Sequence, residues 1–238
     1  MRMHKKRNLE PRMQAVGSLL IYRGKPCRNL SEAARSFRML INAEETFGNG
    51  NPIELEVGCG NGAFIAEKAT REPNVNFVAV EVCTNVIVTA MEKVQNAGLT
   101  NVRFLNIAAE ILPCFLAEGS VRRIYLNFST PLPEANREKQ RLTSKRFLGI
   151  YKDLLTEGGE IIQKTDSEPF FDYSLRMYRE NGFEVSGITR DLHASEFAKD
   201  NIITEYERNF SQKGMPIFRA VARLVKKETE TPGGGGNE

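Results

Sequence analysis

The sequence predicts an α/β protein built on an open sheet with a nucleotide-type site at one edge. Three observations support this prediction. An apolar run over 53–57 is followed by glycines at alternate positions and then by a helical pattern over 63–71. The next apolar run, over 76–81, ends in an acid, Glu81, which stands 21 residues after Gly60. Strand and helix patterns then alternate along most of the remaining chain, as they do in proteins with open α/β sheets.

The glycine-rich turn Gly58-Cys59-Gly60-Asn61-Gly62 is the stretch around which the chain is organised. Each glycine in a regular element costs roughly 0.5–1 kcal/mol relative to alanine, so three together indicate a backbone that turns tightly or contacts a ligand. A strand, a glycine turn and a helix in this order open a nucleotide-type site. An acid at the end of the following strand, here Glu81, accepts hydrogen bonds from the hydroxyls of a ribose. The ligand is therefore expected to carry a ribose.

Two ribose-bearing cofactors fit this pattern. Residues 58–63 satisfy the loose dinucleotide pattern G-x-G-x-x-A, so an NAD-dependent oxidoreductase is one alternative. Glu56 stands two residues before the first glycine, where its carboxylate would repel a pyrophosphate but would suit the positively charged end of S-adenosylmethionine. This position favours S-adenosylmethionine as the cofactor and a methyltransferase as the function. A P-loop is excluded, because no Gly-Lys-Ser/Thr follows the glycines.

Composition narrows the class further. The 238 residues suit one α/β domain with a small extension, and a net charge of +3 is only mildly basic. The four cysteines are widely spaced, which argues against a disulfide framework or a structural zinc site and favours a reducing compartment. The apolar runs are too short to cross a membrane, and the basic start lacks the apolar stretch of a signal peptide. We therefore expect a cytoplasmic protein with no metal and no membrane association.

The chain is expected to divide into three segments. Residues 1–50 hold a basic arm, which could be a solvated tail or could meet nucleic-acid phosphates, and a helix from a Ser31 cap to about Thr46 that packs on the sheet. Residues 51–226 form the main domain. Residues 227–238, which include four glycines, are expected to be a disordered tail. The basic residues of the arm are Arg2, Lys5, Lys6, Arg7 and Arg12.

Further elements follow in order along the main domain. Helices are predicted over 84–97, 109–116, 143–155 and 169–180, and strands over 102–107, 123–127, 160–165, 183–189 and 217–225. Gly158 and Gly159 are expected to end the third of these helices. The last two strands are expected to pair antiparallel at the sheet edge. A proline-containing loop over 128–137 begins at the carboxyl end of a strand, which is where ligands bind in open α/β sheets. The segment 137–152 that follows is rich in basic residues, which favours contact with phosphates.

Five stretches together resemble the bacterial tRNA (guanine-N7)-methyltransferase family. They are Arg-Ile-Tyr-Leu-Asn-Phe-Ser at 123–129, Arg-Leu-Thr at 141–143, Lys-Thr-Asp at 164–166, Asp-Leu-His-Ala at 191–194 and Thr-Glu-Tyr-Glu at 204–207. The combination is specific, and the resemblance covers about residues 1–13 and 50–225. It implies a class I, Rossmann-like, mostly parallel sheet of seven strands with helices on both faces and an antiparallel edge strand. It also implies transfer of a methyl group from S-adenosylmethionine to N7 of a variable-loop guanine in tRNA.

The resemblance also implies a donor site, with two departures from the family pattern. Thr130 stands where the family has an acid beside donor and target, and Ala108 stands where an acid lies near the adenine. Glu110 could replace the second acid from a different angle. No residue is assigned as catalytic. The residues expected to bind the donor are Glu56, Gly58, Gly60, Glu81, Ala108 and Thr130.

A substrate site is implied in the same way. Carboxylates at 166, 205 and 207 could accept hydrogen bonds from N1 and the 2-amino group of a guanine, a readout that requires the nucleotide to be unstacked. His193 is expected to order a loop. The residues expected to meet the tRNA are Asp166, Thr204, Glu205, Tyr206 and Glu207.

The altered loop leaves two hypotheses for activity. The family usually has Asp-Pro-Trp-Pro, basic residues and a histidine where this chain has Thr130, Leu132, Glu134 and Arg137. Guanine N7 has a free lone pair, so catalysis is mostly positioning and charge stabilisation, and losing one oriented electrostatic group typically costs about 10²–10³ in rate. The chain is then either an active methyltransferase with a diverged site, or a relative that binds donor and RNA with lost or altered transfer. The sequence leaves monomer and homodimer both open.

Overall fold

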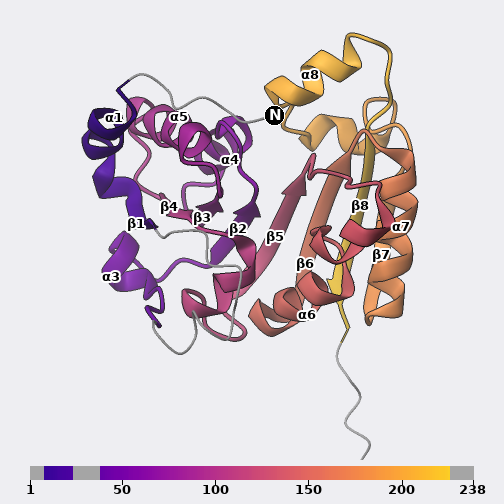
Figure 1. The fold of residues 1–238 in the computed structure, drawn as a ribbon, viewed down its shortest axis with the longest axis horizontal. Helices are drawn as coiled ribbons and strands as arrows, with labels where there is room; N and C mark the ends of the chain where they lie inside the picture. Colours follow the sequence, from indigo (N-terminus) through magenta and orange to yellow (C-terminus); the bar gives the residue numbers. More distant parts are fainter. Residues whose placement is uncertain (1–7, 24–37, 226–238) are drawn as a thin grey trace, which may run out of the picture.

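Figure 1 shows the computed structural model, which describes residues 8–23 and 38–225. One sheet of eight strands runs through it in the order β1-β4-β3-β2-β5-β6-β8-β7. Neighbouring strands are parallel except for β8, which runs antiparallel to both β6 and β7. The seven expected strands and the antiparallel pairing near the edge are confirmed, and β1 adds an eighth strand. The strands are β1 (Leu20–Arg23), β2 (Ile53–Val57), β3 (Asn76–Val80), β4 (Val102–Asn106), β5 (Val121–Asn127), β6 (Leu155–Thr165), β7 (Phe183–Thr189) and β8 (Phe218–Leu224).

Helices cover both faces of the sheet, as expected. One buried cluster packs α6, α7 and η2 against the sheet, and a second packs α1, α4 and α5. The α-helices are α1 (Leu9–Ala15), α3 (Ala43–Phe47), α4 (Ala63–Arg71), α5 (Thr84–Asn96), α6 (Lys145–Leu154), α7 (Glu168–Glu180) and α8 (Glu205–Ser211). The short 3₁₀ helices are η1 (Gly17–Leu19), η2 (Ala109–Cys114), η3 (Ala135–Gln140) and η4 (Glu196–Asp200). Within the described residues, each helix is too short or too polar to cross a bilayer.

The strand order determines where a ligand can bind. From β2 the chain proceeds to β3 and β4 on one side of the sheet, whereas β5 lies on the other side of β2 and leads to β6. The strand order therefore reverses between β2 and β5, and open α/β sheets bind ligands outside the carboxyl ends of the strands at such a point. Figure 1 shows α8 beyond the carboxyl ends of β5 and β6, near this point.

Two predicted elements differ from the structure. Residues 38–42 are not helical, because the N–H groups of Met39 and Ile41 donate hydrogen bonds to the carbonyls of Cys114 and Phe115 at 2.9 and 2.7 Å. The helix begins only at α3, capped by Asn42, and Ser31 lies outside the described residues. The glycines at 158 and 159 do not end a helix. They lie within β6, which starts directly after α6 and pairs with Val121 before its register shifts.

The described part of the basic arm folds onto the domain. Leu9 and Met13 of α1 are buried in the cluster that contains α5. Arg12 forms a two-pronged ion pair with Glu92, with both nitrogen–oxygen distances 2.6 Å, so its guanidinium is engaged by protein. Contact of the arm with phosphates stays a prediction, and Arg12 already has an acidic partner within the protein. The arm's other basic residues and the predicted tail lie outside the described residues.

Candidate functional site

The glycine turn has the backbone that its sequence predicts. Gly58, Gly60 and Gly62 all have positive φ angles, of 80°, 55° and 75°. A side chain at Gly62 would lie 2.6 Å from Cβ of Ala90, so this glycine lets α4 pack closely on α5. Within the described part of the chain, no other atom lies within 4 Å of a Cβ built on Gly58 or Gly60. The first two glycines therefore leave open space beside the carboxyl end of β2, where a ligand can approach the backbone.

Glu81 follows β3 and lies beside this turn. Its two carboxylate oxygens accept hydrogen bonds from the N–H groups of Gly60 at 3.3 Å and Cys83 at 2.9 Å. Glu81 lines a cavity of about 440 Å³ together with Gly58 and Ala108, and Glu110 lines the same cavity. Arg146 reaches Glu110 at 3.5 Å. The structure thus brings together Gly58, Glu81 and Ala108, and it supplies a carboxylate at Glu110 near the missing acid.

The two glutamates of β2 are both buried, but only one is fully paired. Glu54 receives hydrogen bonds from Arg122 at 2.6 Å and Tyr125 at 2.7 Å. Glu56 receives one bond through Oε1, from Nδ2 of Asn127 at 3.0 Å, while Oε2 has no hydrogen-bond partner among the described residues. Burial raises the pKa of Glu56 to about 7. This carboxylate is therefore held at the edge of the glycine turn without the partners that normally accompany a buried charge.

Asn127 completes a pair of unpartnered acceptors. It ends β5 next to Glu56, and its Oδ1 also has no hydrogen-bond partner among the described residues. Leaving a buried acceptor unpaired costs about 1–3 kcal/mol, so such a pair calls for an explanation. A positively charged donor such as an ammonium group would satisfy both oxygens. The sequence analysis predicts no role for Asn127. The feature that could have indicated one is that a polar residue ends the otherwise apolar run Ile-Tyr-Leu.

A second cavity, of about 360 Å³, lies on the other side of Gly58. Glu56, Asn127 and Gly60 line it on one side, and α8 lines it on the other through Glu205 and neighbouring residues. Because Gly58 lines both cavities, they form the two ends of one crevice across the carboxyl ends of β2, β3 and β5. This crevice is the candidate functional site.

The segment that begins α8 faces this second cavity. Thr204 caps the helix, because its Oγ1 accepts a hydrogen bond from the N–H of residue 207 at 3.1 Å. Glu205 accepts a hydrogen bond from Nδ2 of Asn61 at 2.8 Å, which joins the helix to the glycine turn. Tyr206 is 47% exposed. Burial, and then the charge of Asp166, raise the pKa of Tyr206. Asp166 itself lines neither end of the crevice.

Glu207 differs from its neighbours because it does not reach the cavity. It is fully buried, and its carboxylate accepts hydrogen bonds from Lys164 at 2.7 Å and Asn201 at 2.5 Å. Nε2 of His193 lies 2.8 Å from the same group. Burial acts to raise the pKa of Glu207, but Lys164, His193 and Asn201 outweigh it and lower the pKa below its usual value. Glu207 therefore anchors α8 to β6, and His193 orders the loop as expected.

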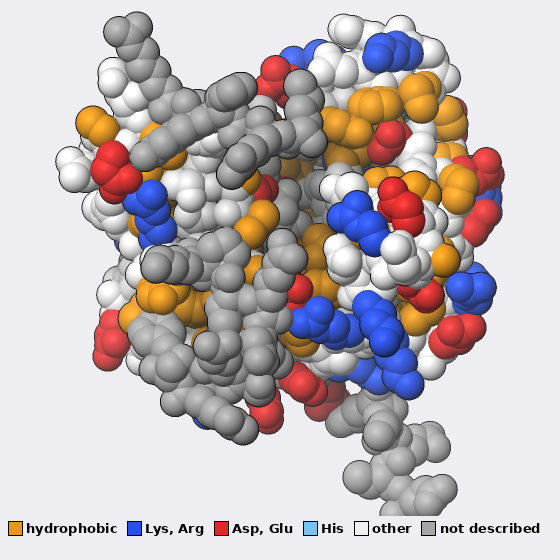
Figure 2. All heavy atoms as spheres, viewed as in Figure 1, with side chains coloured by type: hydrophobic (Ala, Val, Ile, Leu, Met, Phe, Trp, Pro, Cys, Tyr) orange, Lys and Arg blue, Asp and Glu red, His pale blue; other side chains and the backbone are white. Residues whose placement is uncertain are grey.

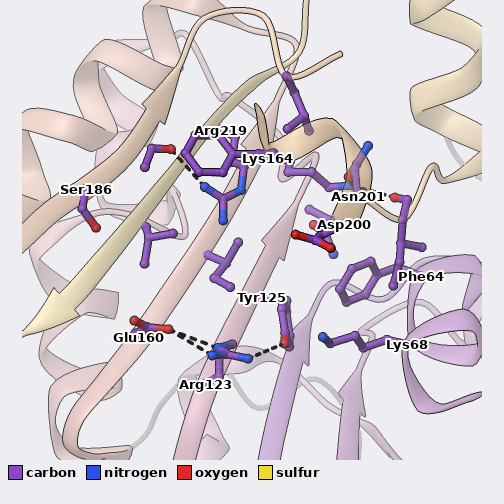
Figure 3. A pocket seen from close by; sticks show the side chains of 17 residues that line it. Phe64, Lys68, Arg123, Tyr125, Glu160, Lys164, Ser186, Asp200, Asn201 and Arg219 are labelled. Carbon is purple, nitrogen blue, oxygen red and sulfur yellow. Dashed lines mark hydrogen bonds and ion pairs between the residues drawn. The ribbon is translucent and has the colours of Figure 1, made fainter. Parts of the chain in front are cut away.

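A larger cavity of about 610 Å³ is lined by Lys164, Arg123 and Arg219 among others (Figure 3). Figure 3 shows Lys164 beside Asn201 at one end, and Arg123 with Glu160 at the other. Arg219 lies across the middle, with its guanidinium 4.4 Å from the ring of Phe197. Phe64 and Asn127 line both this cavity and the one beside α8, so it adjoins the crevice around Gly58, and its cations Lys164 and Arg123 are each paired with acids.

The altered loop lies on the remaining side of the crevice. Thr130 lines a separate cavity of about 480 Å³ together with Arg137 and Arg141, and the structure does not place it among the residues lining the two ends of the crevice. Leu132 lines both the loop cavity and the end of the crevice near Glu81. Among the described residues, no group of three or more His, Cys, Asp or Glu side chains could hold a metal ion.

Basic side chains gather beside this loop. Figure 2 shows a group of Lys and Arg side chains on the half of the molecule where α6 and α7 lie. Within the basic segment 137–152, four cationic residues are exposed: Arg137, Lys139, Lys145 and Arg146.

Comparisons with known proteins identify the family of this chain. Residues 50–220 match the family described as "Putative methyltransferase". A tRNA (guanine-N(7)-)-methyltransferase of Bacillus velezensis is 48% identical over 182 residues, which are 76% of this chain and 83% of that protein. One from Brevibacillus brevis is 42% identical over 186 residues, or 78% and 87% of the two chains.

Solved structures share the fold at low identity. The 16S rRNA methyltransferase KamB superposes with a TM-score of 0.58 at 16% identity, covering 77% of this chain and 92% of that one. An antibiotic-related methyltransferase gives 0.55 at 18% identity, covering 76% and 92%.

The fold and the crevice around Gly58 define a class I S-adenosylmethionine-dependent methyltransferase. Within that class, the chain belongs to the bacterial tRNA (guanine-N7)-methyltransferase family. The resemblance drawn from the five sequence stretches is thus confirmed, and nothing in the comparisons favours the NAD-dependent alternative.

Proposed function

We propose that this chain transfers the methyl group of S-adenosylmethionine to N7 of a guanine in tRNA, at the crevice around Gly58. The observation that carries the proposal is the pair of buried, unpartnered acceptors, Oε2 of Glu56 and Oδ1 of Asn127, beside the glycine turn. The ammonium of the methionine moiety has the charge and the donors that these oxygens lack. The names of the relatives supply the tRNA and guanine-N7 part of the proposal. A tRNA substrate supports a cytoplasmic location.

The donor is proposed to span the crevice. Its methionine end would lie at Glu56 and Asn127, and its ribose at Glu81, whose carboxylate is already oriented by two backbone N–H groups. The adenine would enter the 440 Å³ cavity beside Ala108 and Leu132. Glu110 lines that cavity and supplies the carboxylate that position 108 lacks. Thr130 lines another cavity, so the proposal does not rest on a contact between this residue and the donor.

Methyl transfer to guanine N7 asks little acid–base chemistry of the protein. S-adenosylmethionine supplies an electrophilic methyl group: the N7 lone pair forms the new N–C bond, and the C–S bond breaks toward sulfur. No proton has to leave the base, and positive charge develops on the guanine. The carboxylates of Asp166 and Glu205 would accept hydrogen bonds from the base and stabilise that charge. Glu207 has no such role in this proposal, because its carboxylate is buried among protein partners.

The proposal favours an active enzyme over a relative that only binds. Glu205 lines the crevice although Thr130 carries no charge, and exposed basic residues beside the loop suit an RNA backbone. The test incubates the protein with unmodified tRNA transcripts and methyl-labelled S-adenosylmethionine, and maps the labelled nucleotide. We expect label at N7 of a variable-loop guanine. Absence of label while donor and tRNA both bind would contradict the proposal and establish the binding-only alternative.

A further inference from the structure

An aromatic cluster stands at the mouth of the crevice. The ring centroid of Tyr206 lies 5.0 Å from that of Phe128 and 4.6 Å from that of Phe210. Phe128 and Tyr206 both line the cavity that contains Glu56 and Gly58. Tyr206 is nevertheless 47% exposed, so this ring contacts two others and still presents a free surface at the crevice.

Phe128 has a strained backbone. It is one of three non-glycine residues with positive φ among those the structure describes, at 52°. Such a conformation costs about 1–3 kcal/mol and persists where the surroundings enforce it, most often at functional sites. Here the N–H of Phe128 donates to the carbonyl of Lys164 at 2.8 Å, directly beyond the end of β5. The strained residue is thus fixed at the end of β5, and its ring packs against Tyr206.

Three further contacts fix the position of Tyr206. Thr204 caps the start of its helix, and Glu205 bonds to Asn61 of the glycine turn. Glu207, the next residue, is buried and paired with Lys164. The exposed ring is therefore carried on a short helix whose first turn is tied to the donor site on one side and to the sheet on the other. Preorganised side chains of this kind suit a binding platform.

We propose that Tyr206, supported by Phe128 and Phe210, is the platform on which the target guanine stacks for methylation. The proposal rests on the proposed function and adds Phe128 as a positioning residue. Enzymes that modify a base must take it out of its own stack, and an aromatic ring replaces the lost stacking. The carboxylate of Glu205 lines the same cavity as the ring of Tyr206, so a stacked guanine can be held by stacking and hydrogen bonding together.

The composition of the chain offers a direct test. It contains no tryptophan, so Tyr206→Trp places a single indole at the platform. Indole emission is quenched when guanine stacks on it. We would titrate this variant with unmodified tRNA and with the same tRNA carrying an abasic site in place of the target guanine, while fluorescence anisotropy of labelled tRNA reports binding. The matched control is Phe197→Trp, whose indole would line the cavity of Figure 3 and not the cavity that Tyr206 lines.

The expected result is strong quenching of the Tyr206→Trp protein that depends on the guanine, and no guanine-dependent change in the Phe197→Trp protein. Equal emission with both tRNAs, at saturating binding, would overturn the platform. The methyl-label assay with the unaltered protein tests the proposed function separately. If that protein transfers label to tRNA while the Tyr206→Trp emission does not depend on the guanine, the platform is wrong and the proposed function still holds.

Kinetics give a second readout that does not depend on the indole. Losing the stacking of one base on an aromatic side chain weakens binding by about 5- to 150-fold, so Tyr206→Leu should lower kcat/KM for tRNA by a factor in that range. Tyr206→Phe keeps the ring and should retain most of the activity, and the dissociation constant of S-adenosylhomocysteine should be unchanged in both. Equal activity of the Leu and Phe variants would also refute the platform.

Discussion

Replacing Lys164 by methionine should destabilise the protein by about 3 kcal/mol. The side chains of Lys164 and Glu207 are 5% and 0% exposed, and the ammonium also donates to Asn201 at 3.0 Å and to the carbonyl of Ile202 at 2.8 Å. Removing one partner of a buried pair leaves an uncompensated charge, which typically costs 3–5 kcal/mol. Glu207 would keep its contacts with Asn201 and with His193, whose side chain is 33% exposed, so we expect the lower end of that range.

Urea unfolding followed by circular dichroism would measure this loss. With a slope of about 2–3 kcal/mol per molar urea, the midpoint should fall by roughly 1–1.5 M. The double variant Lys164→Met/Glu207→Leu removes both charges and should recover most of the stability, since apolar replacements of buried pairs are often neutral. Arg71→Ala, which breaks an exposed pair with Glu67, should cost under about 1 kcal/mol. A loss of less than 1 kcal/mol for Lys164→Met, or a double variant no more stable than the single one, would refute the reasoning.

Three further predictions concern the crevice. Burial raises the pKa of Glu56 to about 7, and only the ionised form of this group attracts an ammonium. S-adenosylhomocysteine should therefore bind about tenfold more weakly at pH 6 than well above pH 7. The stability of the protein without ligand should change in the opposite direction, because the raised pKa makes the folded state lose stability as pH rises from about 4.5 to 7. Calorimetry should show a flatter pH dependence for Glu56→Gln, and an equally steep one would count against the assignment. Gly62→Ala places a Cβ 2.6 Å from Cβ of Ala90 and should lower the free energy of unfolding by at least about 1–3 kcal/mol, as measured by thermal unfolding. The control is Gly98→Ala, where the new Cβ has open space and the loss should be clearly smaller. Similar losses for the two variants would contradict the packing role of Gly62. Thr130→Asp should raise kcat by up to about 10²-fold with the donor dissociation constant unchanged, and an unaltered kcat would show that the loop compensates elsewhere.

Elements governed by local pattern were predictable from the sequence. The strand 53–57, the helix 63–71 and the strand 183–189 have the predicted bounds, because short periodic runs flanked by glycine or loop residues leave few alternatives. The extended segment 38–42 was not predictable, since its hydrogen bonds go to carbonyls more than 70 residues away. β1 was missed for the same reason: four residues of an edge strand depend on β4 for their pairing.

The site shows the same division between local and distant information. The glycines and Glu81 could be placed from spacing alone, because one strand-turn-helix unit determines their positions. The pairing of Glu56 with Asn127 joins positions on two strands that are 71 residues apart in sequence, so only the fold reveals that both have an unpaired oxygen. Glu205 and Glu207 look alike in sequence, yet the helical turn directs one to the glycine turn and buries the other against Lys164.

Binding of the methyl donor's ammonium group by Glu56 and Asn127 is the central feature of the proposed site. Calorimetry with S-adenosylhomocysteine and with its analogue lacking the amino group tests this directly, in the unaltered protein and in Glu56→Gln. Hydrogen bonds to a charged group contribute about 1.5–3 kcal/mol, so the analogue should bind the unaltered protein about 10- to 150-fold more weakly. The two ligands should differ far less in Glu56→Gln. Equal binding of both ligands to the unaltered protein, or the same difference in both proteins, would contradict the assignment.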